Sequence, residues 1–184
     1  MFKSKKIQHG FSLIEVLVSL LVLSVGMLGL GGLQMAAVKG TANAHARTVA
    51  SALMHDLTDR MRANPENASN PAEGFYQNDI TCASSVRRCY RDSCNPQQKA
   101  RYDVKEILCG IQNREAGIRH ELLNGNLLVE QTPANCVMAG INYTDAQYRV
   151  DISWGERNLH QNQTGDNNTR SQTLTACVRP SRVP

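Results

Sequence analysis

The longest apolar segment of the chain runs from Leu13 to Val38 and contains one charged side chain, Glu15. About 20 mostly apolar residues are enough for a helix to cross a bilayer. The segment therefore predicts a membrane-spanning helix near the amino terminus. A carboxylate inside such a helix is costly to bury, so Glu15 is expected to have a functional role and a cationic partner.

Beyond Lys39 the pattern changes to that of an amphipathic helix. Apolar residues recur at intervals of three or four, at Ala42, Ala46, Val49, Leu53, Leu57 and Met61, with Arg47, Ser51, His55, Asp59 and Arg62 on the other side. No stop signal separates this helix from the apolar segment, so we expect one helix from Phe11 to Ala63, about 80 Å long. It should end at Asn64-Pro65, because the residue before a proline avoids the α region.

Four glycines lie in the second half of the apolar segment, at Gly26, Gly29, Gly31 and Gly32. Each weakens a helix by roughly 1 kcal/mol relative to alanine, which predicts a local melt or bend. The alternative is a small-residue face that lets membrane helices pack closely. Both interpretations remain open at the level of sequence.

A second helix is predicted after a polar loop. Residues 66–79 are rich in Asn, Pro, Glu and Gly and predict the loop. Asn95-Pro96-Gln97-Gln98 is typical of a helix start, with Asn as the cap and the last Gln returning a hydrogen bond. Apolar residues then keep a helical phase, at Ala100, Val104, Ile107, Ile111, Ile118 and Leu122. Gly110 and Gly117 leave its continuity open, and Asn124-Gly125 predicts a turn.

The final third of the chain predicts strands. Apolar and polar residues alternate strictly from Tyr148 to Trp154, as in a strand with one buried face. Leu127–Gln131 and Thr173–Val178 are two further candidates, and the polar residues 156–172 are expected to form a hairpin loop. The predicted fold class is therefore α+β, with a long N-terminal helix packed on a small antiparallel sheet.

All six cysteines lie in the part of the chain that follows the long helix: Cys82, Cys89, Cys94, Cys109, Cys136 and Cys177. An even number in an exported domain predicts disulfides, which six cysteines can form in fifteen ways. A bond between Cys136 and Cys177 would tie the strands together, and the first four would fasten the loop to its helix. The alternative is zinc or thiol chemistry, but there is no C-x-x-C and no recognised zinc spacing. We expect no metal and no cofactor.

Composition argues against an enzyme and against a nucleic-acid partner. The sequence has no Gly-rich phosphate loop, no G-x-S-x-G and no H-E-x-x-H. Without the three lysines of residues 1–10, the formal net charge falls from +4 to +1, which gives no general attraction to nucleic acid. Arg87, Arg88 and Arg91 form a local basic cluster that we interpret as a solvated loop.

The start of the chain resembles the processing site of type IV pilins and pseudopilins. The residues that carry the resemblance are a basic leader and Gly10-Phe11-Ser12-Leu13-Ile14-Glu15-Val16. The resemblance implies that a prepilin peptidase cleaves after Gly10 and methylates the new amino terminus of Phe11. It also implies a type IV pilin fold, and assembly in which Glu15 meets the positive amino terminus of a neighbouring subunit.

Further motifs are most similar to minor pilins of the PilV type. They are the helix exit Asp59-Arg60-Met61-Arg62-Ala63-Asn64-Pro65, Tyr102-Asp103, and the strand Val150–Trp154. Such a subunit joins a minor-pilin complex that primes pilus assembly, lies at or near the tip, and supports twitching motility and adhesion. The implied partners are prepilin peptidase, other minor pilins, the major pilin, the inner-membrane assembly platform and a tip adhesin.

The expected organisation follows from these segments. Residues 1–10 are the leader, 11–38 the membrane or fibre-core half of the helix, 39–64 its amphipathic half, and 65–184 a disulfide-bonded head. The lysines of the leader favour a cytoplasmic amino terminus. We therefore expect a single-pass protein of the bacterial inner membrane with a periplasmic head, which becomes extracellular in the pilus.

Three alternatives remain at the level of sequence. A minor pseudopilin of a type II secretion system would have the same N-terminal helix. A membrane-anchored periplasmic binding or thiol-redox domain would use the apolar segment only as an anchor. An ordinary secretory signal would be cleaved beyond the apolar core, but Glu15 at the start of that core argues against it.

Overall fold

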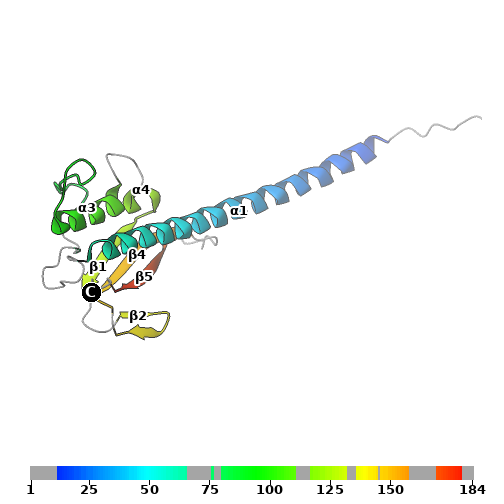
Figure 1. Ribbon diagram of the computed structural model, residues 1–184. Coiled ribbons are helices and arrows are strands. Elements are labelled where there is room, and N and C mark those ends of the chain that lie inside the picture. The colour runs from blue at the N-terminus through cyan, green and yellow to red at the C-terminus, as the bar shows by residue number, and fades with distance from the viewer. Residues whose placement is uncertain are drawn as a thin grey trace, which may run out of the picture. The chain divides into compact units, whose positions relative to one another are not determined.

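The computed structural model describes residues 12–65, 76, 80–110, 117–131, 136–144, 146–157 and 169–179. The chain divides into two compact units, Met1–Thr41 and Ala42–Pro184. Helix α1, Leu13–Arg62, contributes to both units (Figure 1). The other described elements all belong to the second unit: α3 (Pro96–Cys109), α4 (Ile118–Glu121), β1 (Asn126–Gln131), β2 (Cys136–Met138), β3 (Ile141–Tyr143), β4 (Tyr148–Arg157) and β5 (Thr169–Val178).

Helix α1 has nearly the bounds that the sequence predicts. It begins at Leu13, where the carbonyl of Ser12 accepts hydrogen bonds from the N–H groups of Glu15 and Val16. It ends at Arg62, just before Asn64 and the proline that follows it, as predicted. The predicted first residue, Phe11, lies outside the described residues.

The glycines of the apolar half do not interrupt α1. Residues 13–62 form a continuous α-helix through Gly26, Gly29, Gly31 and Gly32. The prediction of a local melt is therefore wrong for this structure. A break would leave backbone N–H and C=O groups unpaired among apolar side chains, where each unpaired group costs several kcal/mol, more than a glycine costs the helix. A Cβ added at any of the four glycines would meet nothing within 4 Å.

The apolar half of α1 exposes nearly all of its side chains. Leu13 is 90% exposed and Leu28 is 78% exposed, and every residue from Ser12 to Val38 is exposed. An apolar surface of this size requires a bilayer or other apolar helices to cover it.

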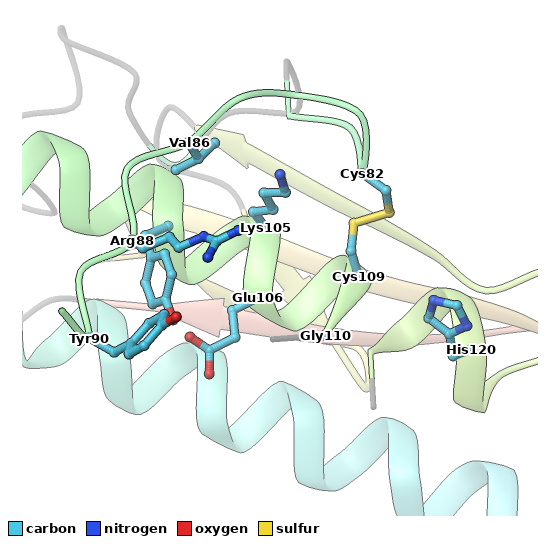
Figure 2. A pocket seen from close by; sticks show the side chains of 10 residues that line it. Cys82, Val86, Arg88, Tyr90, Lys105, Glu106, Cys109, Gly110 and His120 are labelled. Carbon is cyan, nitrogen blue, oxygen red and sulfur yellow. A yellow bond between two sulfur atoms is a disulfide. The ribbon is translucent and has the colours of Figure 1, made fainter. Parts of the chain in front are cut away.

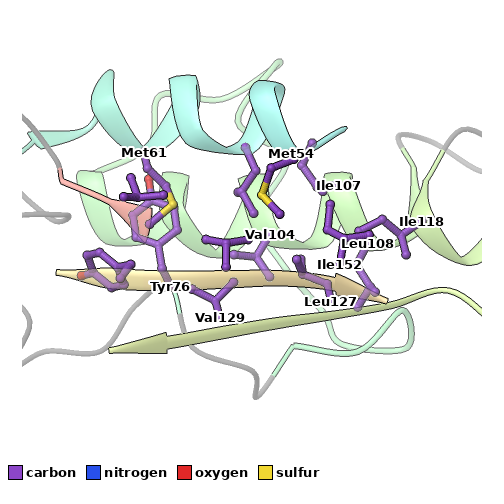
Figure 3. Close-up of a cluster of buried hydrophobic side chains, with 14 of the residues drawn as sticks. Met54, Met61, Tyr76, Val104, Ile107, Leu108, Ile118, Leu127, Val129 and Ile152 are labelled. Atoms are coloured by element: carbon purple, nitrogen blue, oxygen red, sulfur yellow. The ribbon is translucent and has the colours of Figure 1, made fainter. Parts of the chain in front are cut away.

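The core of the second unit lies between helices and sheet. Figure 3 shows Met54 and Met61 of α1 and Val104 of α3 pointing toward the strands that carry Leu127 and Ile152. The fully buried side chains with the largest volumes are Tyr76, Tyr148, Leu57, Met61, Ile107, Ile118, Ile152, Val129, Val150, Val178 and Cys136. The α+β prediction of a long helix packed on a small antiparallel sheet is confirmed.

The buried stripe of α1 is rotated slightly from the predicted one. Its centre is Ala50, Met54, Leu57 and Met61, while the predicted Ala46, Val49 and Leu53 are only partly buried beside it. Ala42 is exposed, against the prediction, because the buried part of the helix begins only at Ala50. The 3.6-residue period predicted for α1 is thus confirmed, and packing against the rest of the second unit determines which face of the helix is buried.

The main sheet has the strand order β1-β4-β5 and is antiparallel throughout. Its register places Leu127 opposite Ile152, and Ile152 opposite Leu174. All three predicted strands are present, but β4 and β5 are longer than expected and shorten the predicted loop 156–172 from both ends. Their pairing continues to Arg157 and Thr169, so polar residues extend the hairpin through backbone hydrogen bonds.

Two short strands, β2 and β3, form a hairpin that the sequence did not predict. Its two turn residues, Ala139 and Gly140, have φ angles of 50° and 80°. Positive φ at both central positions is the geometry of a two-residue type I′ turn. Alanine is unusual at the first of these positions, which explains why no turn is predicted there from the sequence.

Helix α3 begins as predicted and ends earlier. The Asn95 side chain accepts a hydrogen bond from the Gln98 N–H, and the Gln98 side chain accepts one from the Asn95 N–H, which completes the predicted capping box. The helix ends at Gly110, whose φ of 78° breaks the α conformation. The apolar positions that keep a helical phase up to Leu122 are therefore not on one helix. Among the described residues after Gly110, the helical ones before β1 are those of the single turn α4.

Asn124-Gly125 forms the predicted turn between α4 and β1. Asn124 has a φ of 51°, and the Gly125 N–H donates to the carbonyl of Leu122. A Cβ at Gly125 would lie 2.3 Å from the carbonyl oxygen of Ile118. Glycine is therefore required here by the close approach of the backbone of α4.

Candidate functional site

Glu15 lies in the first turn of α1. It is exposed, and it is the only charged residue between Ser12 and Val38 of the sequence. A carboxylate is favoured near a helix N-terminus because the unpaired N–H groups there carry partial positive charge. The helix is long and apolar enough to cross a membrane. The position thus combines an apolar surface with one negative group.

The hydroxyl side chains along this part of α1 bond to the backbone of the helix itself. The hydroxyls of Ser19, Ser24 and Thr41 donate to backbone carbonyls of Glu15, Leu21 and Ala37 at 2.7, 2.8 and 2.9 Å. Such bonds along the helix remove the need for water. Glu15 is therefore the group on this surface whose charge calls for an external partner.

The processing residues Gly10 and Phe11 lie outside the described residues. The structure therefore does not test cleavage after Gly10, N-methylation of Phe11 or the pairing of Glu15 with an amino terminus. These roles remain predictions.

In the second unit, Arg60 joins α1 to α3 through three carboxylates. Its guanidinium donates to Asp56 at 2.9 and 3.1 Å, to Asp103 at 3.1 Å and to Glu106 at 3.0 Å. The Asp103 side chain is only 4% exposed. The sequence analysis missed this network, although Asp56 and Arg60 have the i, i+4 spacing of a helical ion pair.

The protonation of this network follows from burial and charge. Burial lowers the pKa of Arg60, but its hydrogen bonds to Asp56 and Glu106 outweigh burial and raise the pKa above its usual value. Burial raises the pKa of Asp103, and the hydrogen bond from Arg60 offsets only part of this effect. Asp103 is thus a buried acid that depends on Arg60 for its charge compensation.

A second ion pair joins α1 to the far end of β4. Arg47 donates to both carboxylate oxygens of Glu156, at 2.7 and 3.0 Å. The Glu156 side chain is 9% exposed, whereas that of Arg47 is 62% exposed. The hydrogen bond from Arg47 lowers the pKa of Glu156. The sequence placed Glu156 in a loop and gave no sign of this partner.

Tyr76 is a core residue that the sequence analysis assigned to a loop. It is fully buried, and its ring meets that of Tyr148 edge-on, with 6.1 Å between the ring centroids. The Asn64 side chain donates to the Tyr76 hydroxyl at 3.2 Å and to the Pro96 carbonyl at 2.8 Å. These contacts connect the end of α1 with the start of α3. The aromatic pair Phe75-Tyr76 within a polar segment was the available signal.

The six cysteines form three disulfides: Cys82–Cys109, Cys89–Cys94 and Cys136–Cys177. The first joins the segment before α3 to the last residue of that helix. The second closes a short loop, and the third joins the hairpin strand β2 to the edge strand β5. All six thiols are thus in disulfides, which fits a structural role rather than a thiol reaction.

A pocket of about 240 Å³ lies between the segment 82–90 and α3 (Figure 2). It is lined by Cys82, Val86, Arg88, Tyr90, Tyr102, Lys105, Glu106, Cys109, Gly110 and His120. Of the predicted basic cluster, only Arg88 lines the pocket. Arg87 lies 4.0 Å from the carboxylate of Asp92, and the Arg91 guanidinium lies 5.6 Å from the centre of the Tyr90 ring.

The described residues contain no group of three or more His, Cys, Asp or Glu side chains that could hold a metal ion. The described residues therefore form interaction surfaces and structural ties. Its parts are an apolar helix with one carboxylate, a head fastened by disulfides, and a small basic pocket.

Comparisons with known proteins give two family matches. A family model described as Type IV pilin Tt1218 matches residues 32–105, and one described as Prokaryotic N-terminal methylation motif matches residues 5–31. No curated protein and no solved structure matches the chain significantly. The two matched segments adjoin and together cover all of α1, and neither specifies a PilV-type subfamily. With the fold described above, they identify the chain as a type IV pilin-like protein.

Proposed function

We propose that this chain is a minor pilin of a type IV pilus, anchored in the bacterial inner membrane by residues 11–38. Its leader, residues 1–10, lies on the cytoplasmic side, in line with the lysines there, and its head lies in the periplasm until assembly carries it out of the cell. The type IV pilin family is structural, so the proposal assigns no chemical reaction to the head.

The observation that carries the proposal is the isolation of Glu15. It is the one charge between Ser12 and Val38, on an exposed apolar helix surface where the hydroxyls of Ser19 and Ser24 bond to backbone carbonyls. A helix that only anchors a domain gains nothing from a carboxylate at this depth, because the group is expensive to place in lipid. A helix that must pack against another helix at one axial position does gain from such a carboxylate, because the carboxylate can pair with a cation at that position.

The mechanism has two steps. Prepilin peptidase cuts after Gly10 and methylates the amino group of Phe11, which remains a protonated amine. As the subunit packs beside another pilin-like helix, the amine of one subunit meets the Glu15 carboxylate of its neighbour, and the apolar faces close around the pair. A buried ion pair favours one register over others more than it adds stability.

The remaining parts of the chain fit the same role. The amphipathic half of the helix, residues 39–64, carries the head, residues 65–184, whose disulfides hold it rigid outside the cytoplasm. We propose that the head contacts other minor pilins and the major pilin, in a complex that primes assembly on the inner-membrane platform and presents an adhesin at the tip. Twitching motility and adhesion belong to the whole fibre.

A minor pseudopilin of a type II secretion system is the nearest competing function, since the same helix would serve it. Identification of the partner pilins by crosslinking from the head would separate the two. A membrane-anchored thiol-redox domain is less well supported, because every cysteine is in a disulfide and none belongs to a C-x-x-C pair.

Mass spectrometry of the mature amino terminus tests the proposal. The protein should be purified from cells that contain a prepilin peptidase, and from matched cells that lack it. We expect a chain that begins at Phe11 and carries one added methyl group in the first case, and an intact leader in the second. A mature chain that begins beyond the apolar segment, or a leader retained in both cells, would overturn it.

A further inference from the structure

The pocket beside α3 plays no part in the assembly through α1 proposed above. It lies in the second unit, it is bounded by the Cys82–Cys109 disulfide, and all of its lining residues are described (Figure 2). Its volume of about 240 Å³ is below the usual range for drug-sized ligands. It therefore suits a ligand of about one sugar ring or one amino acid.

Two cations face this space from different elements. Arg88 comes from the segment before α3, and no partner for its guanidinium is present among the residues that the structure describes. Lys105, on α3, donates one hydrogen bond to the carbonyl of Ser84. An ammonium group has three donors, so Lys105 keeps capacity for a ligand. Two cations beside one pocket favour a negatively charged occupant.

The one carboxylate that lines the pocket does not cancel this charge. Glu106 accepts a hydrogen bond from Arg60 at 3.0 Å and belongs to the network that joins α3 to α1. Its charge is therefore balanced from outside the pocket. His120, on α4, adds positive charge only when it is protonated.

Aromatic side chains give the pocket a second kind of surface. Figure 2 shows Tyr90 beside Arg88 and Glu106, and the ring of Tyr102 also lines the pocket. Burial, followed by the charge of Glu106, raises the pKa of Tyr102 to about 12. Its hydroxyl therefore stays protonated at physiological pH and can donate a hydrogen bond. Tyrosine rings also offer a flat apolar face with a polar edge.

We propose that this pocket binds an oxyanion, a carboxylate or a phosphate, carried by a small polar ligand such as a sugar acid or a sugar phosphate. Arg88 and Lys105 hold the oxyanion, and the tyrosines contact the body of the ligand. Charged hydrogen bonds to guanidinium and ammonium groups are the strong contacts of such a site. The inference does not depend on the proposed role of the chain in pilus assembly.

The test measures binding of defined probes to the full chain in a neutral detergent. Glucuronate, glucose 1-phosphate and uncharged glucose are titrated separately and followed by broadening of their NMR lines. We expect at least one of the two anions to bind and glucose not to bind. Binding of glucuronate alone identifies a carboxylate site, and binding of glucose 1-phosphate alone identifies a phosphate site. Failure of both anions to bind, or equal binding of glucose, would overturn the proposal.

Matched variants locate the site. Arg88→Gln and Lys105→Gln should each weaken binding by about tenfold, since each removes a charged hydrogen bond. Arg87→Gln removes a neighbouring charge that does not line the pocket, and it should leave binding unchanged. An equal loss in all three variants would indicate a diffuse charge effect and contradict a defined pocket. Near-UV circular dichroism checks that each variant keeps the native fold.

Discussion

Glu15 is an exposed carboxylate in the first turn of an apolar helix, and no positive side chain follows it in sequence until Lys39. The effect of Glu15 on assembly depends on whether its charge is paired when lipid or another helix covers this apolar surface. In lipid or beside another helix, an unpaired carboxylate carries a large desolvation cost. The positive amino terminus of a neighbouring subunit offsets this desolvation cost only where it lies beside Glu15. This one side chain can therefore set the axial register between two neighbouring helices.

Replacing this carboxylate tests its role directly. Glu15→Leu should keep or improve insertion into the membrane, because it removes the one charge of the segment, but should strongly reduce co-purification with partner pilins. Ser24→Ala is the matched control, since it removes a polar group that is already bonded to the Leu21 carbonyl. Pull-down from detergent extracts, together with counts of surface pili, measures the effect. Unchanged co-purification and piliation in Glu15→Leu would contradict the proposed pairing.

Glu156 shows how one residue can make the stability of the head depend on pH. The hydrogen bond from Arg47 lowers its pKa in the folded state below the ordinary value of 4.5. The pair therefore adds stability above the unfolded pKa, and this stability is lost as the pH falls through the folded pKa.

Arg47→Met should accordingly lower the Tm at about pH 7, and this effect should diminish as the pH falls toward about pH 2 through the lowered pKa of Glu156. Thermal unfolding followed by circular dichroism across this range measures the difference. In a Glu156→Gln background, the same change should have no pH-dependent effect. A difference in Tm that stays constant from neutral to acid pH would show that the pair is not its source.

At the scale of elements, the sequence predicted those with strong local signals. The period of α1, the capping box of α3 and the alternation in β4 each use many residues or a specific pair, and each is confirmed. The β2–β3 hairpin has strands of three residues, too short for a periodic pattern. The end of α3 depended on a left-handed Gly110, which a continuing apolar phase concealed.

The functional and structural residues of the candidate site also fall into those predictable from local sequence and those brought together only by folding. Glu15 was found because a charge in an apolar segment is a local anomaly. The partners of Arg60 were not found, because Asp103 and Glu106 lie more than forty residues away and meet it only after α1 and α3 pack. The pocket was missed for the same reason, since its two cations come from separate elements.

Arg60 is the main polar tie between α1 and α3, and its removal should loosen their packing. Arg60→Met keeps much of the side-chain volume but leaves Asp103 buried without its counter-charge. We expect a loss of about 3 kcal/mol, the lower end for breaking a buried pair, because Arg60 is itself 26% exposed. Denaturant unfolding of the full chain in detergent measures the loss.

Arg62→Met is the matched control for this prediction. Arg62 pairs with Asp59 at 3.2 Å, but the two side chains are 57% and 71% exposed. Such exposed pairs contribute about 0–1 kcal/mol, so the control should change little. Equal losses in the two variants would show that helix propensity or volume, rather than the buried network, is responsible.

At the scale of the whole molecule, the chain has one unit whose apolar surface needs an external cover and one with a core of its own. The disulfides all lie in the second unit. Its core is modest in size, and a small exported domain commonly gains its remaining stability from such bonds. The redox state should therefore affect the head and leave the apolar half of α1 unchanged.

The contribution of each disulfide should follow the length of chain that it closes. The sequence separations are 41 residues for Cys136–Cys177, 27 for Cys82–Cys109 and 5 for Cys89–Cys94. Loop-closure entropy then predicts stabilisation of about 4, 3.5 and 2 kcal/mol in that order. Replacing each pair by alanines, one pair at a time, and measuring the Tm of the full chain in detergent tests this order. The fraction of protein in the membrane should stay the same in all three variants, because the anchoring segment contains no cysteine. If removal of Cys89–Cys94 lowers the Tm most, chain entropy is not the dominant effect, and the loop that it closes must instead hold native contacts of the head.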